Sequence, residues 1–127
     1  MHSLILTYPT TMQDVGLLEG KFLQLSLAAR DYILFASTSE YRYHNQLLAR
    51  FLSEQGIPHR WEGGEKLVVE YPQLAVTGGG RFRLDVIRET LHLWDDSSVY
   101  GRFDPSRLAV QLASAGAPWD RLELSIG

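Results

Sequence analysis

One histidine in the first half of the chain is well placed for acid–base chemistry. His44 lies three and four residues before Leu47 and Leu48, so it falls on the apolar face of an expected helix, in its first turns. The helix dipole there disfavours the protonated ring, and a general base requires a neutral imidazole. The alternative is a histidine at the edge of the core that binds a backbone carbonyl, and the residues alone favour this alternative.

Two segments in the second half of the chain have the composition of anion-binding sites. Gly78 to Gly80 form a run of three glycines, which permits positive φ angles and lets backbone N–H groups converge on an anion. Arg81 follows at once with a planar guanidinium that suits phosphate oxygens. The second segment is the polar loop 95–98, Asp-Asp-Ser-Ser. For the glycine run, the alternative is a strand-to-strand corner beside a surface arginine, and the residues alone favour neither interpretation.

The elements that must position these groups follow from the spacing of apolar residues. Leu23, Leu25 and Leu27 alternate with polar residues, which predicts a strand with one apolar face. The segments expected to form strands are 4–6, 21–27, 32–36, 66–71, 81–86, 90–94 and 121–126.

Two helices are expected between these strands. Ser37 and Glu40 fit a capping box, so the first helix should begin after Ser37 and end near Gly56. Asp104 and Pro105 are typical of a helix start and predict the second helix. The residues expected to fill the second helix are Leu108, Val110, Leu112 and Ala113.

The composition bounds the fold and the class of partner. With 127 residues, 45% of them hydrophobic and 21% charged, the chain fits a single domain over residues 1–127. The element order predicts an α/β fold, a mixed sheet of about six strands flanked by two helices. A net charge of −3 gives no support to nucleic-acid or membrane binding, and the lack of cysteine excludes disulfides and thiolate sites. No apolar run is long enough to span a bilayer, so we expect a cytoplasmic protein.

The stretch from the glycines to Tyr100-Gly101 resembles the core signature of the phosphohistidine phosphatase (Janus/Ocnus) family. The elements that agree in order and spacing are Gly78 to Arg81, a strand, a second strand containing His92, then Ser97 and the Tyr-Gly pair. The likeness extends over roughly residues 21–127 and implies the same α/β fold. Residues 57–77 are longer here than in the family.

The resemblance also implies roles for particular residues. The catalytic histidine of the family follows a tyrosine at the start of the first helix, as His44 does here. The helix after His44 is about three residues shorter than in the family, so alignment from its other end puts Tyr41 at the catalytic position instead. Because tyrosine is a poor base at neutral pH, we choose His44. By the same resemblance Lys21, Arg81, the Ser97 hydroxyl and the Val99 amide hold phosphate.

The implied function is a metal-independent phosphatase without a cofactor, acting on phosphohistidine or on a related phosphoramidate or phosphomonoester. Its partner would be a phosphorylated protein or a small phosphorylated substrate. Asp95 and Asp96 depart from the family pattern, because carboxylates oppose phosphate binding unless they point away or are paired with arginine. They raise a rival hypothesis, a divalent cation held by these two residues with His92 nearby, which adjacent carboxylates on a strand do not favour.

Two further functions remain open at this point. The chain would be a non-catalytic module of the same fold if it only binds a phosphorylated or acidic partner. It would be a structural subunit of an oligomer if Trp61 or Trp119 is exposed and anchors an interface.

Overall fold

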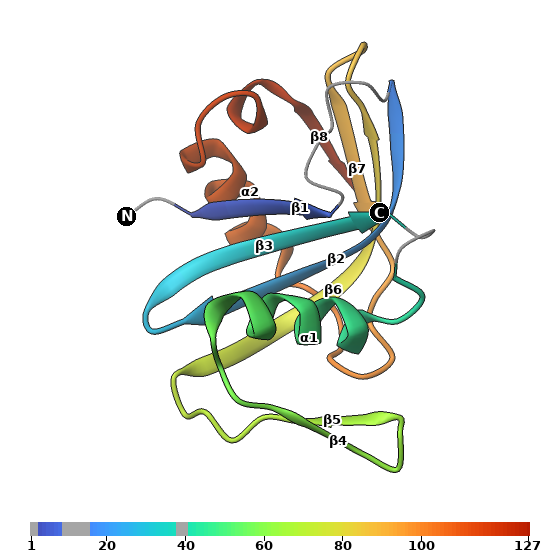
Figure 1. Ribbon diagram of the computed structural model, residues 1–127. Coiled ribbons are helices and arrows are strands. Elements are labelled where there is room, and N and C mark those ends of the chain that lie inside the picture. The colour runs from blue at the N-terminus through green and yellow to red at the C-terminus, as the bar shows by residue number, and fades with distance from the viewer. Residues whose placement is uncertain (1–2, 9–15, 38–40) are drawn as a thin grey trace.

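The computed structural model describes residues 3–8, 16–37 and 41–127. A six-stranded mixed sheet has one helix on each face, which confirms the α/β fold expected from the sequence (Figure 1). The elements in chain order are β1 (Leu4–Tyr8), β2 (Leu17–Leu27), β3 (Arg30–Ser37), α1 (His44–Gln55), β4 (Arg60–Glu62), β5 (Lys66–Val68), β6 (Leu74–Asp85), β7 (Thr90–Trp94), α2 (Pro105–Ser114), the 3-10 helix η1 (Trp119–Arg121) and β8 (Glu123–Ile126).

The two longest strands form the centre of the main sheet, whose order is β1-β3-β2-β6-β7-β8. The central strands β2 and β6 are antiparallel, whereas the outer pairs β1–β3 and β7–β8 are parallel. Both central strands are longer than expected. Residues 17–20 extend β2 by pairing with residues 82–85, and residues 74–80 extend β6 by pairing with residues 22–27. Lys21 therefore lies within β2 and not at its start.

An apolar core lies on each face of the sheet. The core under α1 contains Leu23, Leu25, Leu34, Leu47, Leu48, Phe51 and Leu52. The core under α2 contains Phe22, Ile33, Phe35, Phe82, Leu93, Phe103, Leu108 and Leu112. Successive residues of a strand point to opposite faces, so β2 and β3 supply both cores. The expectation of a single apolar face on 21–27 is therefore wrong, and Gln24 is buried.

The first helix begins later than the capping box predicted. Its first residue is His44 and its N-cap is Tyr43, while Ser37 is the last residue of β3, where it pairs with Gly20 of β2. Glu40 lies outside the described residues. The Gln46 side chain closes the helix start instead, because its Oε1 accepts hydrogen bonds from the N–H groups of Arg42 and Tyr43, both at 3.1 Å. The expected end is confirmed, since Gly56 caps the helix with a positive φ of 71°.

The second helix begins as expected, with Asp104 as N-cap and Pro105 in its first turn. Its inward face differs from the prediction, because Val110 is exposed and Gln111 is buried. Gln111 Oε1 accepts a hydrogen bond of 2.9 Å from Gln24 Nε2, and Gln24 Oε1 accepts one of 2.8 Å from the Asp104 N–H. This buried amide pair fixes the start of α2 on the sheet.

The glycine run 78–80 lies inside β6 and is not a corner between strands, so the expected nest of convergent N–H groups does not form there. These residues pair with 22–24 of β2, and the Gly79 N–H donates to the Gly101 carbonyl at 3.0 Å. Close packing explains the glycines. A Cβ on Gly79 would lie 2.5 Å from the Phe22 carbonyl oxygen and 2.9 Å from His44 Cδ2.

The segment that is longer than in the resembling family forms the two-stranded β4–β5 hairpin, apart from the main sheet (Figure 1). Its turn contains Gly63 and Gly64, both with positive φ. Asn45 Nδ2 near the start of α1 donates to the Glu65 carbonyl at 2.9 Å and ties the hairpin to the helix. In the described ranges no helix is long and apolar enough to cross a membrane.

The packing at Gly79 is tested by Gly79→Ala. The added methyl group has to displace the Phe22 backbone or the His44 ring, so we expect the free energy of unfolding in urea to fall by about 1–3 kcal/mol, the usual cost of overpacking. Thr77→Ala is the matched control, because Thr77 is exposed on the same strand. If both variants are equally stable, the close approach of α1 to β6 is not what requires a glycine.

Candidate functional site

A cleft of about 970 Å³ opens where the start of α1, the loop after β7 and the β4–β5 hairpin meet. It is lined by Lys21 of β2, residues 43–46 at the start of α1, Trp61, Gly64 and Glu65 of the hairpin, and residues 95–99 of the loop. The fold thus brings together four of the five site residues predicted from the sequence: His44, Lys21, Ser97 and Val99. Arg81 is not among the lining residues.

The His44 ring is held in one orientation against the middle of the sheet. The residue is only 5% exposed, and its Nε2 lies 3.0 Å from the Gly80 carbonyl oxygen. A carbonyl only accepts, so Nε2 carries the hydrogen and Nδ1 is the unprotonated nitrogen of the neutral ring. No described residue binds Nδ1, and no buried side-chain nitrogen or oxygen in the described residues lacks a partner. Nδ1 is therefore accessible from the cleft.

The His44 imidazole is biased toward its neutral form. Burial is the main cause and lowers its pKa below 6.5, and the nearby Lys21 ammonium lowers it further. The Gly80 hydrogen bond and the charges of Asp95 and Asp96 act in the opposite direction, and burial outweighs them. The sequence argument expected a neutral ring because of the helix dipole, and the structure adds removal from water as a cause of the lowered pKa.

The loop after β7 is closed on itself. Ser97 and Gly101 exchange two backbone hydrogen bonds, and the Tyr100 N–H donates to Ser97 Oγ at 3.1 Å. No acceptor within the described chain meets the N–H groups of Ser98 and Val99, and both residues line the cleft. The Ser97 hydroxyl hydrogen also has no acceptor among the described residues. The loop thus offers a cleft-facing ligand two free backbone donors.

Lys21 and Arg81 are directly opposite each other on β2 and β6, so their side chains leave the same face of the sheet. Lys21 is half-buried and lines the cleft. Arg81 is exposed, and its guanidinium carbon lies 5.6 Å from the centre of the Trp94 ring on β7. The arginine predicted to bind phosphate therefore lies over an indole and is not among the residues that line the cleft.

Three other residues weighed from the sequence lie outside the cleft lining. Tyr41 packs edge-on against Tyr8, and its hydroxyl accepts from Arg50, so it does not replace His44 at the cleft. His92 stacks on Trp94 with its Nδ1 2.8 Å from Ser125 Oγ, away from Asp95 and Asp96. The described residues contain no group of three or more metal-ligating side chains. Trp119 stacks on Phe35 at 5.1 Å and is only half-exposed.

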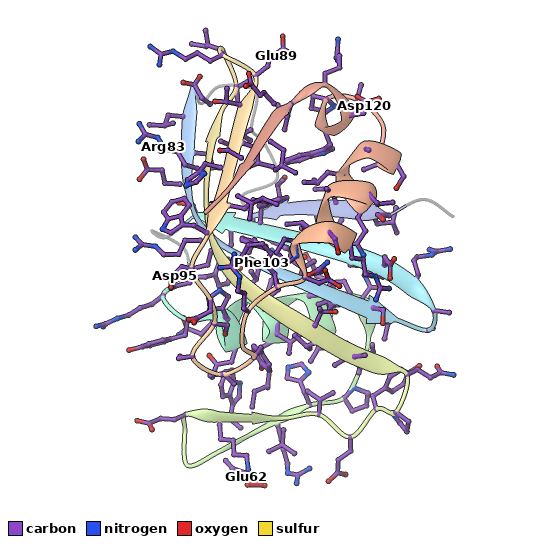
Figure 2. The ribbon with its side chains drawn as sticks, turned by 180° about the vertical axis from the view of Figure 1, so that it is seen from behind. Glu62, Arg83, Glu89, Asp95, Phe103 and Asp120 are labelled. Carbon is purple, nitrogen blue, oxygen red and sulfur yellow. The ribbon has the colours of Figure 1, made fainter. Side chains whose placement is uncertain are left out.

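Carboxylates make up much of the charge in the cleft. Asp95, Asp96 and Glu65 line it, and no described residue forms an ion pair with any of the three. The arginines that could have paired with these carboxylates make other contacts. Arg83 pairs with Glu19 at 3.4 Å, and Arg102 donates to the Asp95 and Gly127 carbonyls. Figure 2 shows Asp95 on the far side of the strands from α2.

Sequence reasoning gave Glu65 and Tyr43 no place in the site, and for Trp61 it favoured a surface loop over a position at the border of a site. All three line the cleft and are exposed, Tyr43 at the start of α1 and the other two in the hairpin. The hairpin reaches the cleft through the Asn45 hydrogen bond and not through any spacing along the chain, so only the composition of the hairpin could have signalled its residues.

A scan against protein-family models finds no match to this chain, and a search of curated proteins finds no match either. The likeness to the phosphohistidine phosphatase family therefore consists of the residue pattern described above, without support from overall sequence similarity. The chemistry of the cleft follows from the positions of its own residues.

The buried His44 should make folding stability depend on pH. Its folded pKa is below 6.5, so as the pH falls below 6.5 the unfolded chain takes up a proton that the folded chain resists. We expect the contribution of His44 to the free energy of unfolding to be constant above this pH and to decrease as the pH falls. Urea titrations of the protein and of His44→Asn measure this contribution as their difference, with His59→Asn as control. A difference that does not change with pH would contradict the assignment of a buried neutral ring.

Proposed function

We propose that this protein hydrolyses a phosphorylated substrate of the phosphoramidate type, such as phosphohistidine, with His44 as general base. The observation that carries the proposal is the His44 ring itself. Its Nε2–H is bound to the Gly80 carbonyl, so the unprotonated Nδ1 is directed to the cleft, and its lowered pKa keeps it ready to accept a proton near neutral pH.

The phosphoryl group would bind across the cleft from His44. The Lys21 ammonium, the Ser97 hydroxyl and the free N–H groups of Ser98 and Val99 are the donors available there. Backbone donors that already face the anion lose little freedom on binding and suit the charge that grows on the phosphoryl oxygens. Arg81 would join them only if its side chain left Trp94.

In the proposed reaction, a water molecule attacks phosphorus while Nδ1 of His44 takes its proton. The P–N bond breaks, its electron pair returns to the substrate nitrogen, and that nitrogen takes up a proton from solvent. Phosphate and the free amine or imidazole are the products. Lys21 offsets the negative charge on the phosphoryl oxygens throughout. Asp95 and Asp96 act against the anion and would lower its affinity.

The substrate would be a phosphorylated protein or a small phosphorylated molecule, and the reaction would take place in the cytoplasm. The second candidate is a non-catalytic module of the same fold, in which the same cleft binds a phosphorylated or acidic partner without turnover.

The role of His44 is tested by His44→Ala on a phosphohistidine peptide. We expect hydrolysis to fall about a hundred- to ten-thousand-fold, the range that a general base supplies, while inorganic phosphate binds within a few-fold of the unchanged protein. Activity should also fall with pH only below 6.5, where the ring becomes protonated. If the protein without substitution binds phosphate but does not hydrolyse the phosphohistidine peptide, the result favours the binding module. Activity that survives His44→Ala refutes the base.

The anion contacts are tested by Lys21→Met and Arg81→Met. Lys21 lines the cleft, so its loss should weaken phosphate binding by about tenfold or more, the scale of one charge-assisted contact. Arg81→Met should have a clearly smaller effect, because its guanidinium lies over Trp94. Arg88→Met is the control, since Arg88 is exposed and pairs with Asp85 at the far turn. Phosphate titrations followed by amide NMR shifts of Ser98 and Val99 give the affinities. A larger effect of Arg81→Met would place the anion over the sheet.

A further inference from the structure

The charges of the cleft do not suit a phosphoryl group by itself. The cleft is lined by one ammonium, that of Lys21, and by the carboxylates of Glu65, Asp95 and Asp96, which form no ion pair with any described residue. Its formal charge is therefore −2 while His44 is neutral. A phosphoryl group brings further negative charge into this space. The carboxylates repel the phosphoryl oxygens, so a bound phosphorylated molecule needs more positive charge than Lys21 alone supplies.

The rim of the cleft has a second property that points to a cationic ligand. Tyr43 and Trp61 line it and are 53% and 41% exposed, from the helix start and the hairpin respectively. Aromatic faces attract ammonium and guanidinium groups, and the Arg42 guanidinium already lies 5.5 Å from the centre of the Tyr43 ring. Aromatic rings beside unpaired carboxylates are the chemistry that recognises lysine or arginine side chains.

The cleft also contains an unpaired acceptor and two backbone donors. His44 is 5% exposed, and its unprotonated Nδ1, which can only accept a hydrogen bond, has no partner among the described residues. The N–H groups of Ser98 and Val99 have no acceptor among the described residues, and both residues line the cleft with Ser97. The cleft therefore combines backbone donors that suit an anion with an acidic and aromatic rim.

We infer that the phosphorylated substrate is a basic polypeptide, in which lysine or arginine side chains flank the phosphorylated residue. The phosphoryl group lies at Lys21, His44 and the Val99 amide, and the flanking cations lie against Asp95, Asp96 and Glu65 and over Trp61. This inference rests on the proposed hydrolase function. It goes further by selecting a polypeptide with positive charge over a free phosphorylated metabolite or an acidic phosphopeptide.

The test uses three phosphohistidine peptides of equal length, with lysine, serine or glutamate at the neighbouring positions. We expect kcat/KM to be about fivefold or more higher for the lysine peptide than for the serine peptide, the scale of one or two exposed ion pairs, and lower again for the glutamate peptide. The difference should shrink in about 1 M salt, where the screening length is near 3 Å. Equal values for the three peptides overturn the inference and leave the hydrolase intact.

The Asp95→Asn, Asp96→Asn double variant assigns the preference to the cleft. Asn suits the positive φ of 70° at Asp95, so the loop should keep its conformation. We expect the ratio of kcat/KM for the lysine peptide to that for the serine peptide to fall toward one. The control Asp120→Asn removes one negative charge at an exposed position remote from Asp95 in Figure 2, and it should retain the ratio. A preference that survives the double variant overturns the inference.

Absence of hydrolysis in all three peptides refutes the proposed function, and binding then decides the inference. The same peptides titrated against His44→Ala, followed by intrinsic tryptophan fluorescence, should rank lysine above serine above glutamate in affinity. Equal affinities overturn the inference independently of turnover.

Discussion

The approach of α1 to the middle of β6 is the constraint on which the rest of the site depends. His44 reaches the Gly80 carbonyl only because Gly79 leaves room for its ring, and a Cβ there would lie 2.9 Å from His44 Cδ2. That contact buries the imidazole, fixes which nitrogen carries the hydrogen and directs the other nitrogen to the cleft. Packing thus requires the glycine run, which contributes to the site by letting the His44 ring approach β6.

The same run also holds the other wall of the cleft. The Gly79 N–H donates to the Gly101 carbonyl, which in turn accepts from Ser97 in the closed loop after β7. The central strand therefore positions both the candidate base and the segment with the free Ser98 and Val99 amides. Because both walls bind the same three residues of β6, a shift of this strand would move them together.

The charges of the cleft set its limits as an anion site. Burial lowers the His44 pKa, which suits a base, but Asp95, Asp96 and Glu65 lie in the same space without ion-pair partners among the described residues. These effects are reconciled if the ligand carries both signs of charge, with the anion near Lys21 and the Ser98 and Val99 amides and the cations at the rim. An electrostatic field of this kind discriminates between ligands more than it increases affinity.

The sequence by itself determined the α/β class, the apolar stripe of α1 and the start of α2, because these follow from local periodicity and capping residues. It also named four residues of the cleft, since they belong to segments with recognisable patterns. Only the tertiary structure decided that Gly78 to Gly80 form a strand and not a nest, that Arg81 lies over Trp94, and that Glu65 and Trp61 join the cleft. These outcomes depend on pairing and contacts between segments distant in the chain, which no local pattern specifies.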